Sequence, residues 1–417
     1  MTGLQACALS ACFDEGICPA LQRTAKRCLL TKRLYRTSQA VTAPHRRWEL
    51  QVAMNSDLQL LIFHDSLDVL GGGEKVVATI AKAFDARIAA ANVDPEVIGE
   101  LGIDQDVIYD LGKIGDRAPI GPIKSSLLFR KVRFPGFDKY LLSGFWSLYA
   151  AYNHKPNVSY CYSPRRDFYD LKHFNIARQS NLAKKAVAWS WTTTHSYFDR
   201  NAIKQVDKIL TLSRTVQKRI TQYYNRDSTV IYPPVPTERY YTKEFGDFWL
   251  SVNRLYPEKR VDLQIKAFEN LPDENLLIVG GYSHRDKGLV AYHKMFEDLP
   301  PNVKILGIIP EKRLLDLYAT CKGVIYTPID EDFGLVPVEA QASGKAVVGV
   351  NEGALKETVI DGQTGFLVDA HPESLKKAIL LVSEEPEQYK KACKKNASRF
   401  DEHIFIESMR QTLCAEE

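Results

Sequence analysis

Two carboxylates stand eight residues apart in the segment 330–340, where Glu331 and Glu339 flank a turn containing Gly334 and Leu335. An apolar run comes before this segment and helical spacing follows it. A turn from a strand into a helix leaves backbone N–H groups free, and the helix dipole adds about half a positive charge there. The segment can therefore hold a diphosphate, with one carboxylate placed for a sugar and the other for a ribose.

A second strand-to-helix loop, within residues 251–262, carries the cations Arg254 and Lys259. Cations in such a loop can offset the negative charge that grows on a leaving diphosphate when a glycosidic bond breaks. On residue types and spacing alone, a solvated basic turn is an equal alternative. The neighbouring Arg260 is interpreted as a surface or interdomain charge.

A third loop is rich in glycine and runs through Gly71, Gly72 and Gly73 to Glu74. Glycine lets the backbone approach a ligand closely, so donor phosphates or an acceptor could lie against this loop. A glycine-rich turn is weakly specific by itself. Glu74 is also explained as an ordinary acidic residue at a helix N-terminus.

These motifs resemble those of the family 4, or group 1, glycosyltransferases, over most of residues 245–370. The resemblance extends to a further set of positions: Ala340, Gly344, Gly353, Glu357, Asp361, Gly362, Thr364, Gly365 and Phe366. It implies the GT-B fold, an α/β fold in which two Rossmann-like domains face a central cleft. It also implies that Glu331 contacts the hydroxyls of the transferred sugar and that Glu339 contacts the donor ribose. Arg254 and Lys259 would then bind the donor diphosphate.

The resemblance also assigns site residues to the first half of the chain. Gly71 and Gly72 match the family's Gly-Gly-x-Glu motif, and Arg166 matches the arginine of a Cys-His-x-Pro-x-Arg motif. An ion pair with a neighbouring aspartate, Asp167 or Asp170, is the alternative role for Arg166. Tyr162 stands at the position of the motif's histidine, so a proton relay is not carried over to it.

Recognition of the nucleobase is expected to come from backbone groups. The turn that includes Gly307 and Ile309 resembles the family's base-binding turn, and the Phe333–Leu335 turn is assigned to the donor phosphates. Backbone contacts leave little trace in side chains, so a GDP-sugar and a UDP-sugar both remain candidates. Residues 259–262 resemble mannosyltransferases that use GDP-mannose, which makes mannose the preferred sugar. Neither a cofactor nor a metal is expected, because the nine histidines show no paired metal spacing.

The three loops need two series of alternating strands and helices to position them. From Leu58 onward, short apolar runs alternate with helical patterns, which is typical of βαβ units and a parallel sheet. Strands are predicted at 58–64, 158–162, 208–212 and 229–232, and then at 248–252, 276–279, 303–306, 324–326 and 346–350. Pro233–Pro236 cannot join a central strand and is interpreted as the interdomain linker. The predicted domains are 56–236 for the acceptor and 245–400 for the nucleotide sugar, followed by a C-terminal helix at 401–417.

Residues 1–53 lack sustained strand or helix periodicity and are predicted to form a disordered extension, with the functional chain starting near Met54. The extension carries eight Lys/Arg and three Asp/Glu. Its net charge, eight minus three or +5, exceeds the net charge of +4 of the whole chain. A zinc site remains an alternative, although no C-x2-C spacing occurs among the four cysteines of this segment, namely Cys7, Cys12, Cys18 and Cys28.

Composition excludes several other classes of protein. With 45% hydrophobic and 25% charged residues, the 417-residue chain fits two globular domains. No run approaches the roughly 20 apolar residues that span a bilayer. The basic excess lies outside the body, so a nucleic-acid partner is not expected. There is no G-x-S-x-G motif, and Cys161 has no evident base, so nucleophilic catalysis by Ser or Cys has no support.

The sequence therefore predicts a retaining glycosyltransferase in which the leaving phosphate itself accepts the acceptor's proton. A nucleotide-sugar epimerase or hydrolase of similar architecture is the alternative among enzymes, and a non-catalytic sugar-nucleotide-binding subunit is the alternative outside them. A glycan or lipid-linked acceptor is expected, because segment 124–141 alternates cations such as Arg130, Lys131 and Arg133 with apolar residues. Such a segment could dock on an anionic leaflet, giving a cytoplasmic protein peripheral to the membrane. An ordinary buried α/β segment with solvated charges is the alternative.

Overall fold

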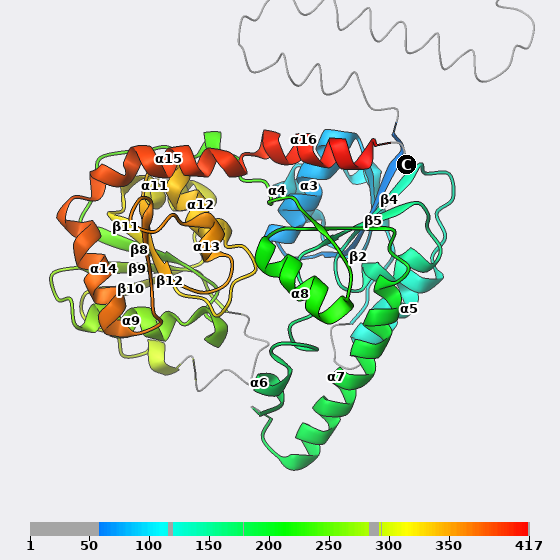
Figure 1. Ribbon diagram of the computed structural model, residues 1–417, viewed down its shortest axis with the longest axis horizontal. Helices are drawn as coiled ribbons and strands as arrows, with labels where there is room; N and C mark the ends of the chain where they lie inside the picture. The colour runs from blue at the N-terminus through cyan, green and yellow to red at the C-terminus, as the bar shows by residue number, and fades with distance from the viewer. Residues whose placement is uncertain (1–57, 116–119, 178, 283–291, 293, 416–417) are drawn as a thin grey trace, which may run out of the picture. The chain divides into compact units, whose positions relative to one another are not determined.

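The computed structural model describes residues 58–115, 120–177, 179–282, 292 and 294–415 (Figure 1). The predicted extension at 1–53, its four cysteines and the proposed start near Met54 lie outside the described residues.

The first domain is built on a seven-stranded parallel sheet with strand order β3-β2-β1-β4-β5-β6-β7. Its strands are β1 (Leu60–Leu67), β2 (Arg87–Val93), β3 (Ile108–Asp110), β4 (Lys139–Ser143), β5 (Asn157–Cys161), β6 (Lys208–Thr211) and β7 (Thr229–Val230). Its helices are α3 (Gly72–Phe84), α4 (Pro95–Leu101), α5 (Ile120–Lys131), α6 (Lys172–Ala177), α7 (Leu182–Ile203) and α8 (Arg214–Tyr224).

The second domain contains a six-stranded parallel sheet with strand order β10-β9-β8-β11-β12-β13. Its strands are β8 (Phe248–Val252), β9 (Asn275–Val279), β10 (Val303–Gly307), β11 (Gly323–Tyr326), β12 (Ala346–Val350) and β13 (Gly365–Val368). Its helices are α9 (Val261–Glu269), α11 (Glu311–Thr320), α12 (Leu335–Ala342), α13 (Leu355–Thr358), α14 (Pro372–Glu384) and α15 (Lys390–Ala397). Two clusters of buried apolar side chains pack in this domain.

The predicted α/β class with two parallel sheets is confirmed, and each predicted strand is present within a few residues of its expected ends. Four further strands, β2, β3, β4 and β13, were not predicted. The segment 124–141 is corrected by the structure, because Phe129, Tyr140 and Leu141 are core residues and β4 lies between β1 and β5. These three side chains cannot enter a lipid leaflet, so the alternative of a buried α/β segment holds for them.

The end of the chain returns to the first domain through α16 (Glu402–Leu413). Phe405, Met409 and Leu413 of α16 are buried in the same apolar cluster as β1 and α3, and Figure 1 shows α16 beside α3. The chain passes between the domains twice, near Val235 and near Phe400. These two segments are hydrogen-bonded to each other, because Val235 N donates to Phe400 O at 3.0 Å. Burial of each of the three α16 side chains, Phe405, Met409 and Leu413, contributes about 1.5–3 kcal/mol to the free energy of unfolding.

Among the described residues, no helix combines the length and the apolar character required to cross a membrane.

Candidate active site

The strand order of the second domain reverses between β8 and β11, which is the topological switch point where open α/β sheets bind ligands. The loop after β8 carries Arg254 and Lys259, and the loop after β11 carries Glu331. Backbone bonds join the two loops, since Ile329 N donates to Glu258 O at 2.8 Å. Sequence-predicted residues that are 72 positions apart or more are thus brought to one edge of the sheet.

Lys259 and Glu331 form a direct ion pair across this edge. Lys259 Nζ lies 2.7 Å from Glu331 Oε2, and both side chains are about four-fifths buried. The backbone of Glu331 packs directly against Gly353, which has a φ of +53°. A Cβ at Gly353 would collide with the backbone amide of Glu331, so glycine is required there both for its conformation and for space.

Helix α12 begins directly after the Glu331 loop, and its N-terminus points backbone donors toward the same edge. Gly334 lies just before the helix with a φ of +83°. No side chain caps this end, so the first-turn amides of Leu335 and Val336 have no intrahelical acceptor. Phe333 is buried in the core and fixes the turn. This arrangement can bind an anion, which is the role that the sequence predicts for residues 333–335.

Glu339 lies in the second turn of α12 and accepts a hydrogen bond from Tyr318. Tyr318 Oη lies 2.8 Å from Glu339 Oε2, and Tyr240 packs edge-to-face on the Tyr318 ring. Burial raises the pKa of Tyr240, and the neighbouring Glu339 charge raises it further. The two tyrosines, which sequence reasoning missed, orient the carboxylate.

Arg254, Gly307 and Ile309 lie in neighbouring loops on the same side of the sheet. Arg254 is exposed and its guanidinium lies 5.9 Å from the centre of the Tyr256 ring. Backbone hydrogen bonds connect the loops after β8, β9 and β10. Leu255 N donates to Gly281 O at 2.9 Å, and Gly280 N donates to Gly307 O at 2.9 Å. Gly307 has a φ of +71° and turns the chain toward Ile309, which is half-buried.

In the first domain, the Gly71–Gly72 loop reaches the N-terminus of α12. A Cβ added to Gly72 would lie 3.1 Å from Leu335 Cδ1, so Gly72 allows close approach between the two domains. Tyr162 contacts this loop through its hydroxyl, which donates to Gly73 O at 3.1 Å and lies 2.9 Å from Ser143 Oγ. Tyr162 therefore hydrogen-bonds to this loop and to β4, and it packs edge-to-face on Tyr160.

His64 of β1 lies beside the Gly71–Glu74 segment, and it was not predicted as a site residue. Its Nδ1 donates to Ser143 O, and its Nε2 lies 3.4 Å from Glu74 Oε1. Burial disfavours the charged imidazole, but the hydrogen bond and charge of Glu74 outweigh burial, so the pKa of His64 is raised. Glu74 is thus a paired carboxylate at the start of α3. A histidine directly after the apolar run Leu60–Phe63 was the available signal.

Arg166 and Arg219 connect the first domain to the loop that carries Glu331. Arg166 pairs with Asp170 at 2.8 Å, its alternative role, and also donates to Ile329 O at 3.1 Å. Arg219 is buried and binds Asp330 Oδ2 at 2.9 Å and the Asp332 carboxylate. Arg219 was not predicted, although an arginine at the buried spacing of Val216 and Ile220 was a signal.

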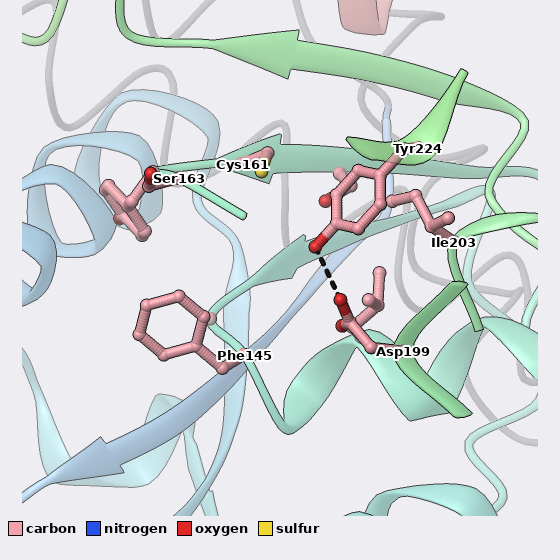
Figure 2. Close-up of a pocket in the computed structure, with 10 residues that line it drawn as sticks. Phe145, Cys161, Ser163, Asp199, Ile203 and Tyr224 are labelled. Carbon is pink, nitrogen blue, oxygen red and sulfur yellow. Dashed lines mark hydrogen bonds between the residues drawn. The ribbon is translucent and has the colours of Figure 1, made fainter. Parts of the chain in front are cut away.

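A cavity at the carboxyl ends of β4 and β5 lies within the first domain (Figure 2). Its volume of about 10 Å³ holds about one water, which is too small for a sugar. Tyr169 and Tyr224 each donate a hydroxyl to Asp199 Oδ2 at 2.8 Å, and burial raises the pKa of Asp199 to about 6. Burial also raises the pKa of Cys161, which does not suit a nucleophile.

Comparison with known proteins identifies the class of the second domain. Residues 242–400 match the family described as Glycosyl transferases group 1. This chain therefore carries the domain of the group 1 glycosyltransferases.

Within that class, the chain resembles mannosyltransferases. It is 30% identical over 224 residues to an alpha-1,3/1,6-mannosyltransferase of Neurospora crassa, covering 47% of this chain and 45% of that protein. It is 32% identical over 152 residues to the alpha-1,3/1,6-mannosyltransferase of Homo sapiens, covering 33% of this chain and 36% of that protein. The chain thus spans less than half the length of these two curated relatives.

Solved structures confirm the predicted GT-B fold. Anabaena HepE, crystallised with UDP and glucose, matches with a TM-score of 0.65 and 20% identity, covering 86% of this chain and 100% of that chain. Sucrose-phosphate synthase from Thermosynechococcus elongatus matches with a TM-score of 0.66 and 15% identity, covering 85% and 98%. At these identities the likeness concerns the fold alone.

Proposed function

We propose that this protein is a retaining glycosyltransferase that moves a sugar, with mannose as the preferred candidate, from a nucleoside-diphosphate donor to a glycan or lipid-linked glycan. The observation that carries the proposal is the Lys259–Glu331 ion pair beside the uncapped N-terminus of α12. A cation, a carboxylate and free amides at one switch point suit a charged diphosphate linked to a sugar.

In the proposed reaction the diphosphate leaves toward Arg254, Lys259 and the amides at the start of α12, which offset its growing charge. Glu331 contacts the sugar hydroxyls, and Glu339 contacts the ribose. The bond from the anomeric carbon to the phosphate oxygen breaks, and the bond to the acceptor oxygen forms on the same face. Bond formation on the same face retains the stereochemistry. The acceptor's proton passes to the leaving phosphate, so the reaction needs no dedicated base, and it uses no cofactor or metal.

Thermal unfolding in the presence of GDP, UDP and ADP tests donor binding. A nucleotide at about 100 times its Kd adds roughly 2.7 kcal/mol to the free energy of unfolding, so the matching nucleotide raises Tm above the others. We expect GDP or UDP to do so. No shift with any of the three would contradict donor binding.

Turnover of the matching nucleotide sugar tests the reaction itself. Nucleotide release that depends on an added glycan acceptor supports a transferase, and NMR of the product's anomeric proton tests retention. Release without an acceptor would favour a hydrolase. Isomerisation of the sugar would favour an epimerase, and binding without turnover would favour a silent subunit.

We also propose that the acceptor is lipid-linked and that the protein works at the cytoplasmic face of a membrane as a peripheral protein. The unpaired state of the four cysteines in the described part of the chain, Cys161, Cys321, Cys393 and Cys414, is consistent with a reducing compartment. Incubation with radiolabelled donor and a membrane extract would place the label in the organic phase. Label that stays entirely in the aqueous phase would favour a soluble acceptor.

A further inference from the structure

Large apolar side chains are exposed along helices α6 and α7 of the first domain. Leu182 is 84% exposed, Val187 is 67% exposed and Tyr197 is 64% exposed, which are high fractions for such residue types. Three aromatic residues of the same two helices are also more than two-fifths exposed: Phe174, Trp189 and Phe198. In Figure 1 the N-terminal half of α7 extends beyond the rest of its domain, alongside α6.

The charge pattern of these helices is one-sided. Residues 171–198 contain no Asp or Glu, whereas the described part of this segment carries Lys172, Lys184 and Lys185. Residues 186–198 contain neither a Lys, an Arg nor an acidic residue. The exposed surface of α7 therefore combines a basic start with an uncharged length of aliphatic, aromatic and small side chains.

The opposite side of α7 attaches the helix to its domain, so the exposed side chains are not needed for the fold. Thr192, Ser196 and Asp199 are buried, and Asp199 accepts two tyrosine hydroxyls. Lys172 Nζ donates to Thr193 Oγ1 at 2.8 Å, which ties α6 to α7. These contacts attach the C-terminal half of α7 to its domain and join α6 to α7.

We propose that this surface docks on an anionic lipid leaflet. We call it the α6–α7 surface and define it by Phe174, Leu182, Val187, Trp189, Tyr197 and Phe198 together with Lys172, Lys184 and Lys185. Trp and Tyr favour the region between lipid headgroups and acyl chains, and lysines near anionic headgroups are attracted to them. Pairing with a second copy of the chain would place like charges together, so a leaflet of opposite charge fits better.

This inference moves membrane docking away from segment 124–141, whose aromatic residues are partly core. Its biological purpose rests on the proposed lipid-linked acceptor. Its test does not, because vesicle binding is measured without donor or acceptor.

The experiment compares the full chain and its variants by sedimentation with vesicles of phosphatidylcholine containing 30% phosphatidylserine. Lys184→Gln with Lys185→Gln is expected to weaken binding by about 30-fold, from about 1 kcal/mol per lysine. Leu182→Ser, Val187→Ser and Trp189→Ser together are expected to leave only binding that 0.5 M salt abolishes. The matched control is Lys391→Gln with Lys395→Gln, two exposed lysines of α15, which is expected to bind like wild type.

Three results would overturn the inference: no sedimentation of wild type with these vesicles, equal binding of the α7 and α15 variants, or equal binding to pure phosphatidylcholine. A wild type that is dimeric by light scattering and a serine variant that is monomeric, with no vesicle binding by either, would assign the surface to self-association instead. Nucleotide-induced Tm shifts are measured on the same variants. Unchanged shifts alongside failed docking would reject the α6–α7 surface and leave the proposed transfer standing.

Discussion

Lys259 is the single residue on which the proposed chemistry depends most, because it is a cation at the switch point and already pairs with Glu331. Lys259→Met is expected to remove about 2–4 kcal/mol of transition-state stabilisation, which lowers kcat/KM roughly 30- to 1,000-fold. Arg254→Ala is expected to fall in the same range. Steady-state kinetics with saturating acceptor would measure both.

Lys266→Met, on the exposed side of α9, is the control and should retain wild-type kinetics. A merely structural ion pair would lower Tm equally in Lys259→Met and Glu331→Gln while leaving turnover near normal. Near-normal turnover of Lys259→Met would therefore refute the assigned role.

Glu339 is assigned to the donor ribose, which is bound in both the ground and transition states. Glu339→Gln is expected to raise the donor KM by about 10- to 100-fold with a smaller change in kcat, because a charged hydrogen-bond acceptor is replaced by a neutral one. The amide oxygen can still accept from Tyr318, so the fold should stay intact. Glu311→Gln, an exposed carboxyl on α11, is the control, and an unchanged donor KM for Glu339→Gln would count against the ribose contact.

At the scale of elements, α7 is attached to its domain through the buried carboxyl of Asp199. Burial raises the pKa of Asp199 from 3.8 to about 6. The folded protein therefore keeps a proton that the unfolded chain releases, so this contribution favours folding at low pH and is lost between about pH 4 and pH 6. The difference corresponds to about 3 kcal/mol.

Asp199→Asn is expected to remove this pH-dependent contribution while the amide oxygen still accepts from the tyrosines. Urea unfolding at several values between pH 4 and pH 7 would measure it. We expect the wild type to lose stability relative to Asp199→Asn as the pH rises. Asp227→Asn, an exposed acid, serves as the control. Parallel curves for wild type and Asp199→Asn would contradict the raised pKa.

At the scale of the whole molecule, Arg219 links the two domains through Asp330 and Asp332. Burial raises the pKa of Asp332, and Arg219 opposes that rise. Arg219→Met removes a buried guanidinium that bridges two partly exposed carboxylates, and it is expected to destabilise the protein by about 1.5–3 kcal/mol. Because the same loop carries Glu331, turnover should fall as well.

Hydrogen exchange would locate this effect, since a two-domain protein need not unfold in a single step. Loss of protection is expected in the 329–334 loop and in α8. Lys218→Met, an exposed neighbour on α8, should leave protection unchanged. Equal protection in Arg219→Met and wild type would show that the domains are held together by other contacts, such as α16 in the first core.

Much of the local structure follows from the sequence by itself. Short apolar runs followed by glycine, a charged residue and helical spacing are local patterns, so the strands before Arg254 and Glu331 and the start of α12 were predictable. Because parallel strands share one edge for their carboxyl ends, the same pattern predicted which loops hold the candidate site. Strands β2, β3, β4 and β13 lie in stretches without a clear periodic signal, so they were missed.

The tertiary structure alone decided which residues meet. Tyr318 is 21 positions from Glu339, His64 is 79 from Ser143, and Arg219 is 111 from Asp330. Each of these pairs depends on strand order or on the contact between domains, and neither leaves a periodic trace in the chain. The same reason explains segment 124–141, where alternating cations and aromatics gave no sign that β4 would lie between β1 and β5. Spacing along the chain defines local conformation, whereas burial depends on what packs against it.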